Sequence, residues 1–378
     1  MHTDESYQAK AVQTKGGAKG ILDGMELLRQ LSGGVGVSGY ENTVADIAAE
    51  GFKGLVDDVR LDKLGNLIML RRGRRQGQGV RGKAPKVMLA AHMDEIGLII
   101  TKIESDGFLR FAPMGGIDQR LLPGQEVLLH GRGKDLYGVI GAKPPHIQTP
   151  EEREKAVKME DLFIDTGLSY IDVREHMAIG DMVTFAQDVV ELRNDRFAGK
   201  AFDDRAGVAA MFECLKFLQN MNHAADVYAV ATVQEEVGVR GAATSTFGIV
   251  PDVGIAIDVG HGEMPGVPET RTIKVGGGPG IAIGPHVHPK ILERLRDTAD
   301  RWHLDFSLEP STVPNGTDAY SIQITQAGIA TALLSLPLRY MHTPVELLEY
   351  GDVEKTGQLL ALFISSVDNE FVEGLRCF

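Results

Sequence analysis

The chain has 378 residues, of which 43% are hydrophobic, so it is long enough and apolar enough to bury a substantial core. Its 52 acidic residues outnumber its 39 lysines and arginines, and the resulting formal charge of -13 argues against nucleic acid or an anionic membrane as a partner. The two cysteines, Cys214 and Cys377, are too few for a disulfide framework. We therefore expect a soluble protein of the reducing cytoplasm.

The first segment of the chain is polar and low in aromatic residues, and we interpret residues 1–23 as a flexible extension. It lacks the apolar stretch of a signal peptide. Nowhere does the sequence contain a run of about 18 apolar residues that could span a bilayer. The sequence predicts no membrane contact and nothing catalytic in the extension.

Two short helices and a hairpin are predicted next. Apolar residues have helical spacing in ILDGMELLRQLSGG from residue 21, and Ser38 and Glu41 have the spacing of a capping box before a second helical stretch. Residues 56–72 alternate like two strands around a turn. The basic, glycine-rich segment 71–86 could bind RNA or an anion, but in an acidic protein we interpret it as a solvated loop.

The rest of the chain divides into two kinds of pattern. Residues 87–100 form an apolar run typical of a buried parallel strand, with polar groups near its carboxyl end. Short alternating runs separated by Gly, Pro and Asp then predict a small β module over residues 100–192. Helix and strand alternate again afterwards. We predict an α/β fold in which one domain, residues 24–99 and 193–378, is interrupted by that inserted β module.

Acidic residues and histidines occur at the ends of predicted strands or at glycine-rich turns in five places. These are His92 with Asp94, Asp203 with Asp204, Glu235 with Glu236, Asp258, and His342. Two divalent metals about 3.5–4 Å apart need mixed imidazole and carboxylate ligands, one bridging carboxylate and an unligated base. The set meets this requirement and indicates a two-metal site.

Two of these pairs have spacings that suggest distinct roles. His92 and Asp94 lie two apart, so on a strand both point to one face, where Asp94 could hold one ring nitrogen while the other binds metal. The adjacent Glu235 and Glu236 cannot both point the same way. One can bind metal while its neighbour faces the substrate water.

Other possible sites receive less support. His286 and His288 could chelate a metal, but the flanking prolines favour an exposed loop, and His261 would be surplus to the ligand set. The glycine-rich stretch KVGGGPGIAIGP matches neither the Walker nor the Rossmann spacing of phosphate-binding loops. No G-x-S-x-G occurs, and neither cysteine has a histidine nearby in sequence, so covalent catalysis finds no support.

From about residue 24 to the C-terminus, the chain resembles the glutamyl aminopeptidase and tetrahedral (TET) aminopeptidase family of co-catalytic dinuclear metallopeptidases. The resemblance rests on six segments in the family's order: AAHMDEIGLII, GKAFDDRAGVAA, ATVQEEVGVRGA, AIDVGHGEMPG, NGTDAYSI and RYMHTPVE. It implies a mixed-sheet α/β/α zinc-peptidase domain with an inserted β-barrel-like dimerisation domain. It also implies dimers that assemble into a hollow tetrahedral dodecamer.

The resemblance assigns a role to each candidate residue. Asp203 would bridge the two metals, His92 and Glu236 would complete one metal, and Asp258 and His342 the other. Glu235 would be the general base, Asp94 would support His92, and the Asp203–Asp204 bond is a candidate for a cis peptide. The cofactors would be two divalent ions per subunit, zinc or cobalt, with manganese as an alternative.

The function that follows is metal-dependent removal of N-terminal residues from peptides. A metal-activated water would attack the scissile carbonyl while Glu235 takes its proton and passes it to the leaving amine. A related deacylase or carboxypeptidase could share the same metals. An endoglucanase-type glycosidase would give neither histidine a role, and this chain has few aromatic residues to stack on a sugar. A scaffold with purely structural metals is the non-enzymatic alternative, and it would not need Glu235.

Overall fold

The computed structural model describes residues 22–74, 83–312 and 316–376. Most of the predicted extension 1–23, the middle of the basic segment 71–86, and Cys377 lie outside these residues. Cys214 is fully buried, as expected for a core residue.

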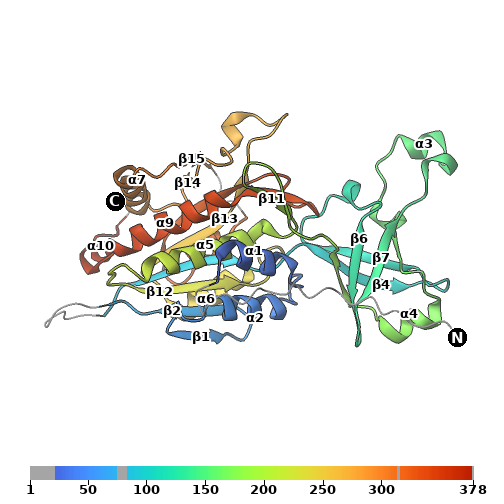
Figure 1. Ribbon diagram of the computed structural model, residues 1–378, viewed down its shortest axis with the longest axis horizontal. Helices are drawn as coiled ribbons and strands as arrows, with labels where there is room; N and C mark the ends of the chain where they lie inside the picture. The colour runs from blue at the N-terminus through green and yellow to red at the C-terminus, as the bar shows by residue number, and fades with distance from the viewer. Residues whose placement is uncertain (1–21, 75–82, 313–315, 377–378) are drawn as a thin grey trace.

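A mixed eight-stranded sheet forms the centre of the larger part of the molecule (Figure 1). Its strands, in spatial order, are β1 (Asp58–Leu61), β2 (Leu67–Arg71), β12 (Asp226–Thr232), β3 (Lys86–His92), β13 (Val253–His261), β16 (Ala330–Leu338), β14 (Gly280–Ile283) and β15 (Ser307–Pro310). The central strands β12, β3, β13 and β16 are mutually parallel, while β1 and β2 form the predicted antiparallel hairpin. Parallel strands end at one edge, so this edge can collect side chains from several segments.

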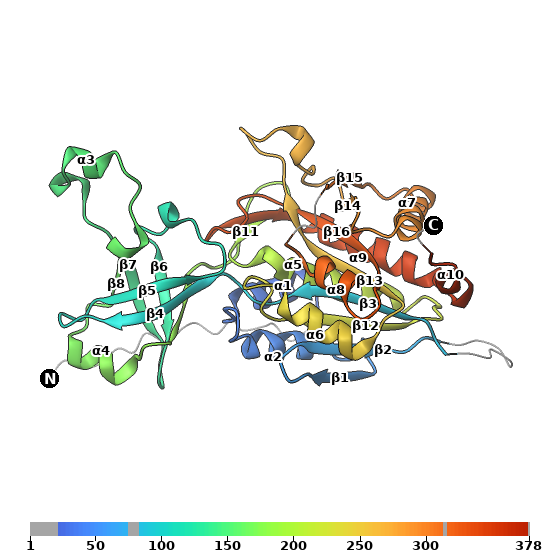
Figure 2. The same ribbon diagram turned by 180° about the vertical axis from the view of Figure 1, so that it is seen from behind.

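Helices cover both faces of the sheet. The described helices are α1 (Gly24–Gly33), α2 (Asn42–Gly51), α3 (Pro150–Arg153), α4 (Tyr170–His176), α5 (Phe202–Leu218), α6 (Arg240–Ile249), α7 (Pro289–Trp302), α8 (Asp318–Ile324), α9 (Tyr350–Ser365) and α10 (Asn369–Glu373). Of these, α3 and α4 belong to the inserted β module and lie away from this sheet (Figure 1). Helices α5 and α9 lie side by side over one face, and α6 and α8 lie over the opposite face (Figures 1 and 2). The central strands are buried on both faces, which explains their continuous apolar sequences.

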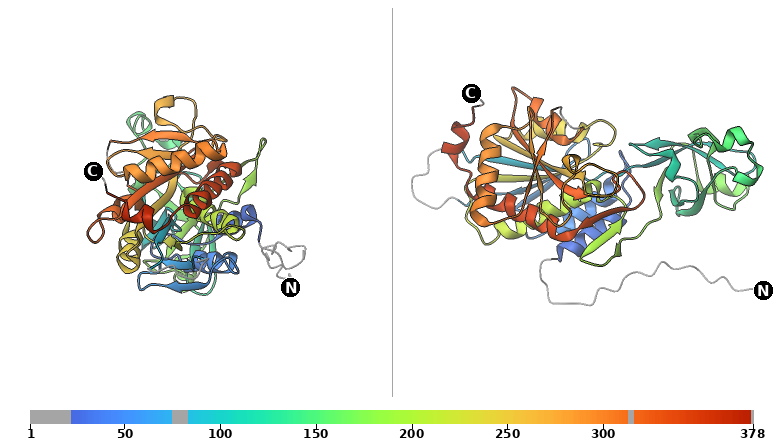
Figure 3. Two further views of the ribbon diagram at one scale, coloured as in Figure 1. Left: turned by 90° about the vertical axis from the view of Figure 1, so that its left-hand side faces the viewer. Right: turned by 90° about the horizontal axis from the view of Figure 1, so that it is seen from above.

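A closed six-stranded barrel lies at one end of the elongated molecule (Figure 3). Its strands, in spatial order, are β4 (Gly97–Ile103), β5 (Leu109–Met114), β8 (Phe163–Asp165), β7 (Leu136–Gly141), β6 (Glu126–His130) and β9 (Met182–Phe185). The barrel encloses its own apolar cluster, separate from the core beneath the helices. The predicted limits of 100 and 192 differ slightly from those of the barrel strands, which span 97–185.

A small three-stranded sheet returns the chain from the barrel to the main sheet. It consists of β10 (Val190–Glu191), β11 (Arg196–Gly199) and β17 (Glu346–Glu349). Strand β11 leads directly into α5, and β17 leads into α9. The antiparallel pairing of β11 with β17 therefore brings together the segment that carries Asp203 and the segment that carries His342.

The predicted α/β fold is confirmed, including both early helices and the hairpin. Of the single buried strand predicted over residues 87–100, only the first half is the parallel strand β3, which ends at His92, whereas residues 97–100 belong to β4 of the barrel. The predicted capping box is wrong. Ser38 donates a hydrogen bond to Asp94 instead of capping α2, and Glu41 accepts from the backbone N–H of Gly39 and Gln234. The spacing shows which residues could cap a helix, but both side chains are used in contacts with distant segments.

Candidate metal centre

The carboxyl edge of the parallel strands gathers the predicted ligands. His92 ends β3, and Asp258 lies near the end of the neighbouring strand β13. The β3–β13 register pairs Ala90 with Ala256, two residues before each of them, so His92 and Asp258 lie at the same level and on the same face. Glu235 and Glu236 follow β12 on the other side of β3.

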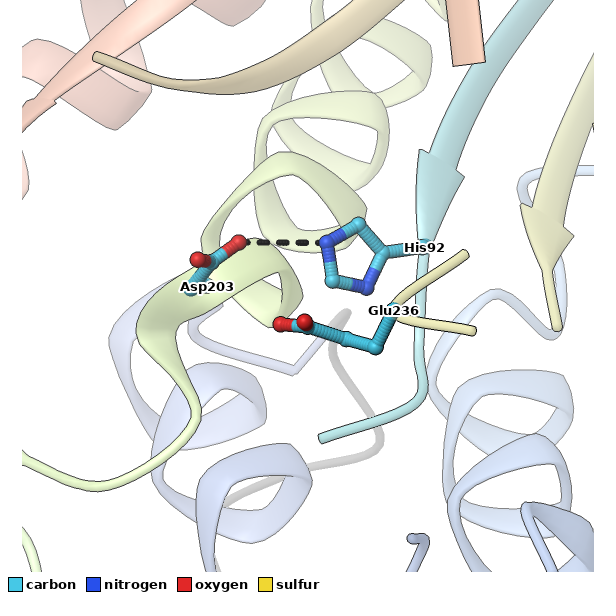
Figure 4. Close-up of side chains that lie close together, drawn as sticks. All are labelled: His92, Asp203 and Glu236. Atoms are coloured by element: carbon cyan, nitrogen blue, oxygen red, sulfur yellow. Dashed lines mark hydrogen bonds and ion pairs between the residues drawn. The ribbon is translucent and has the colours of Figure 1, made fainter. Parts of the chain in front are cut away.

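Asp203 lies between the two histidines and faces each with a different oxygen. His92 Nε2 is 3.1 Å from Asp203 Oδ1, and His342 Nε2 is 3.3 Å from Asp203 Oδ2. Figure 4 shows His92 and Glu236 converging on Asp203 at the start of α5. One carboxylate is thus shared by two imidazoles, as a bridging ligand requires.

The remaining ligands form two groups around this shared carboxylate. Glu236 Oε1 lies 3.4 Å from His342 Nε2. Ligand atoms of His92, Asp203 and Glu236 can all come within 4.8 Å of one another, as can those of His92, Asp204 and Asp258. The five predicted ligands therefore form one cluster.

Glu235 points into the same cluster, but its contact with the ligand His92 is longer than a hydrogen bond. Its Oε2 lies 3.9 Å from His92 Nε2. Its Oε1 is buried and has no hydrogen-bond partner among the described residues. An unpaired buried carboxylate oxygen is costly unless a ligand or a water meets it, which fits a base that faces substrate.

The pKa values of the clustered carboxyl groups show that the cluster requires positive charge. Burial raises the pKa of Glu235 to about 10, that of Asp258 to about 8 and that of Glu236 to about 7. Asp203 is buried too, but hydrogen bonds with His342 and His92 overcome burial and hold its pKa low. Near neutral pH these carboxylates can all be ionised only if cations compensate them, so the donor set fits divalent metals.

Asp94 contacts more than His92. Its Oδ1 is 3.5 Å from His92 Nδ1, while its backbone oxygen is 3.1 Å from the same nitrogen. The carboxylate also accepts hydrogen bonds from the backbone N–H groups of Glu235 and Glu236 and from the hydroxyl of Ser38. Asp94 therefore orients the imidazole and fixes the turn that carries both glutamates.

Glu41 holds the residue before that turn. Gln234 has a left-handed backbone, with φ of 56°, and donates its N–H to Glu41 Oε1 at 3.1 Å. Glu41 itself is buried, which raises its pKa. The loop before α2 thus positions Glu235 through the backbone.

Glu346 performs the same task for two ligands. Its Oε2 accepts the backbone N–H of Asp203 at 3.0 Å, and its Oε1 accepts that of His342 at 3.1 Å. Sequence reasoning assigned Glu346 no role, although it falls in the segment RYMHTPVE. The only indication of its role in the sequence was its position four residues after His342, because nothing in the spacing links Glu346 to Asp203.

Two further acids near the cluster had no role assigned from the sequence: Asp204, which was named only together with Asp203, and Asp318. Asp204 accepts the backbone N–H of His92 and of Gly207, and the Asp203–Asp204 peptide bond is cis, as the resemblance implies. Asp318 accepts a hydrogen bond from the hydroxyl of Thr232 at 2.5 Å, and burial raises the pKa of Asp318 to about 6.

The other predicted histidines lie apart from the ligand cluster. His286 and His288 are 2% and 7% exposed, so the expected exposed loop is wrong. The ring nitrogens of His286 have no hydrogen-bond partner in the described part of the chain, and neither histidine joins a potential ligand group there. His261 is exposed and lines the cleft beside the cluster.

A cleft of about 1060 Å³ opens over the cluster. Its lining includes His92, Asp203, Glu235, Glu236 and Asp258. Further lining residues come from the end of β13, the loop between β13 and β14, and β15. None of the described helices is both long enough and apolar enough to cross a bilayer.

Together the mixed sheet, the barrel and the histidine–carboxylate cluster define a metal-dependent peptide hydrolase. The model of the M42 glutamyl aminopeptidase family matches residues 65–359. The chain therefore belongs to the M42 glutamyl aminopeptidase family, and it is an aminopeptidase that hydrolyses peptide bonds.

Individual relatives agree over almost the whole chain. A lysyl aminopeptidase of Pyrococcus furiosus is 39% identical over 88% of this chain and 94% of its own. The crystal structure of a TET aminopeptidase from a marine-sediment Thaumarchaeota archaeon has a TM-score of 0.87 and 33% identity, covering 93% of this chain and 99% of its own. The TET1 peptidase of Pyrococcus horikoshii, described as able to assemble into a tetrahedron or a large octahedral shell, has a TM-score of 0.79 and 30% identity, covering 91% and 100%.

The contact between Glu41 and Gln234 generates a prediction about catalysis. Glu41→Ala removes the acceptor of two backbone N–H groups, so we expect kcat to fall by about tenfold or more as the turn before Glu235 loosens. Glu41→Gln keeps a carbonyl oxygen at that place and should restore most of the rate. Steady-state kinetics with one aminoacyl substrate will measure both.

The control is Glu50→Ala, which removes an exposed acid from the end of α2 and should leave kcat within twofold. Equal kcat values for Glu41→Ala and the unmodified protein would contradict a positioning role.

Proposed function

We propose that the cluster holds two divalent metal ions and that Glu235 is the general base of aminopeptidase hydrolysis. The proposed ligands are His92, Asp203, Glu236, Asp258 and His342. The observation that carries the proposal is Asp203, whose two oxygens face two different histidines. Zinc or cobalt suits such a mixed set, and manganese is an alternative.

The contacts favour a division of the ligands that differs from the one the resemblance implied. His342 lies close to Glu236, and both lie close to Asp203. His92 and Asp258 lie level on adjacent strands. We therefore assign Glu236 and His342 to one ion and His92 and Asp258 to the other, with Asp203 shared.

When bound, such ions lower the pKa of a coordinated water and polarise a carbonyl oxygen. Glu235 supplies the proton transfer, because its free Oε1 is buried beside the ligands and faces none of the described donors. It accepts a proton from the attacking water and donates it to the leaving amine. Asp94 keeps Glu235 in place through its backbone N–H.

The substrate we propose is a peptide with a free α-amino group. Support comes from the family and from its relatives, which are described as aminopeptidases. Comparing free with N-acetylated forms of the same peptides tests this against a deacylase or carboxypeptidase. Faster hydrolysis of the N-acetylated forms would overturn the choice.

We infer further that the barrel mediates dimerisation and that dimers assemble into a tetrahedral dodecamer in the cytoplasm. Support comes from the barrel's separate core and from the shells that the TET1 relative forms. Light scattering of the purified protein tests this, with an expected mass twelve times the subunit mass of 40.9 kDa. A monomer at micromolar concentration would contradict it.

Replacing Glu235 should separate chemistry from metal binding. Glu235→Gln keeps the size of the side chain but removes the base, so kcat should fall by about 10²–10⁴-fold. Both metal ions should remain, because the five ligands are intact. Kinetics together with elemental analysis of the same sample will check this, and loss of an ion from this variant would instead make Glu235 a ligand.

Double variants test the division of the ligands. If Glu236 and His342 share one ion, replacing both by Ala should leave the other ion bound, so each subunit keeps about one. His342→Ala combined with Asp258→Ala removes a ligand from each ion and should leave about none. Metal content after dialysis against limiting metal measures both. The reverse pattern would restore the pairing of His92 with Glu236.

A further inference from the structure

Glu309 places a carboxylate in the lining of the cleft, beside the ligand cluster. It lies on β15 and is half-buried. Its Oε2 accepts a hydrogen bond from the hydroxyl of Ser335 at 2.5 Å. Ser335 pairs with Asp258 in the register of β16 and β13, so the bond fixes Glu309 close to a proposed metal ligand.

Two glycines lie next to this carboxylate. A Cβ at Gly260 would lie 3.4 Å from Glu309 Oε1, and one at Gly280 would lie 3.3 Å from Oε2. Gly260 is two residues beyond Asp258 on the same strand, so it lies on the same face. The carboxylate of Glu309 therefore lies beside the backbone of Gly260, two residues after Asp258 on the same strand.

The surroundings of Glu309 combine apolar surface with little competing charge. Ile273 lies over the same two glycines, because a Cβ at Gly260 or Gly280 would meet Ile273 Cδ1 at 2.6 Å in either case, and Ile273 also lines the cleft. Of the described residues that line the cleft away from the ligands, the only other Asp, Glu, Lys or Arg side chains are Glu269 and Arg271. Both are exposed, two residues apart and of opposite charge.

We propose that Glu309 selects peptides whose N-terminal residue is lysine or arginine. This inference rests on the proposed function and names its substrate class. The aliphatic part of such a side chain would lie along Ile273 while its charged end meets the carboxylate of Glu309. An apolar N-terminal residue would leave that half-buried carboxylate without a counter-charge, which lowers its relative rate.

An alternative role for Glu309 would be to hold the α-amino group, which every substrate shares. The two roles differ in one measurable ratio. A side-chain selector changes the kcat/KM for lysyl substrates relative to leucyl substrates, whereas an α-amino anchor changes both equally.

The experiment compares Lys, Arg, Leu and Glu aminoacyl substrates on the unmodified protein and on Glu309→Gln and Glu309→Lys. We expect the unmodified protein to prefer Lys and Arg, and the Lys:Leu ratio of kcat/KM to fall roughly 10- to 100-fold in Glu309→Gln. Glu309→Lys should favour the Glu substrate over Lys. Glu309→Gln can still accept the Ser335 hydrogen bond, so its fold should be intact.

Glu269→Gln is the matched control, because it neutralises an exposed acid in the same cleft, and its Lys:Leu ratio should stay within twofold. An unchanged ratio in Glu309→Gln, or an equal fall for all substrates, would overturn the inference while leaving the proposed function in place. If the unmodified protein cleaves none of the four substrates with its metals bound, the proposed function fails and this inference fails with it.

Discussion

Burying several carboxylates beside one another is the constraint on which the rest of the structure depends. Burial raises the pKa of Glu235, Glu236 and Asp258, whereas Asp203 escapes this effect through its two histidines. Such a cluster is stable near neutral pH only with cations at its centre. The buried strands beneath it supply the rigid frame that keeps like charges from moving apart.

That frame reaches the ligands through backbone hydrogen bonds more than through side-chain packing. Glu346 fixes the N–H groups of Asp203 and His342, and Asp94 fixes those of Glu235 and Glu236. In each case one carboxylate joins two groups, so their spacing is set by the width of a carboxyl group. This arrangement holds the proposed ligands in more precise positions than loops alone would provide.

The sequence predicts the parts of the site that follow from local pattern. His92 and Asp258 could be placed because each ends an apolar strand, and parallel strands end at one edge. Ser38 and Glu41 were misread because capping spacing is local, whereas their partners are distant in the sequence. Glu346 was missed for the same reason. Pairing the ligands by ion requires distances across the sheet, which periodicity does not contain.

The fold also separates the chemistry from the selection of substrates. The proposed ligands lie on or just beyond the central strands and at the start of α5, and all but His342 lie in or at the edge of the buried cluster, where a change disturbs the charge balance. Glu309 lies on β15, the edge strand of the sheet, and is half-buried. A substitution there alters the cleft without removing a counter-charge from the metal cluster. Selectivity can therefore change at the edge of the sheet while the hydrolytic centre stays intact, because Glu309 is hydrogen-bonded to the hydroxyl of Ser335, on the strand beside Asp258, and not to a proposed ligand.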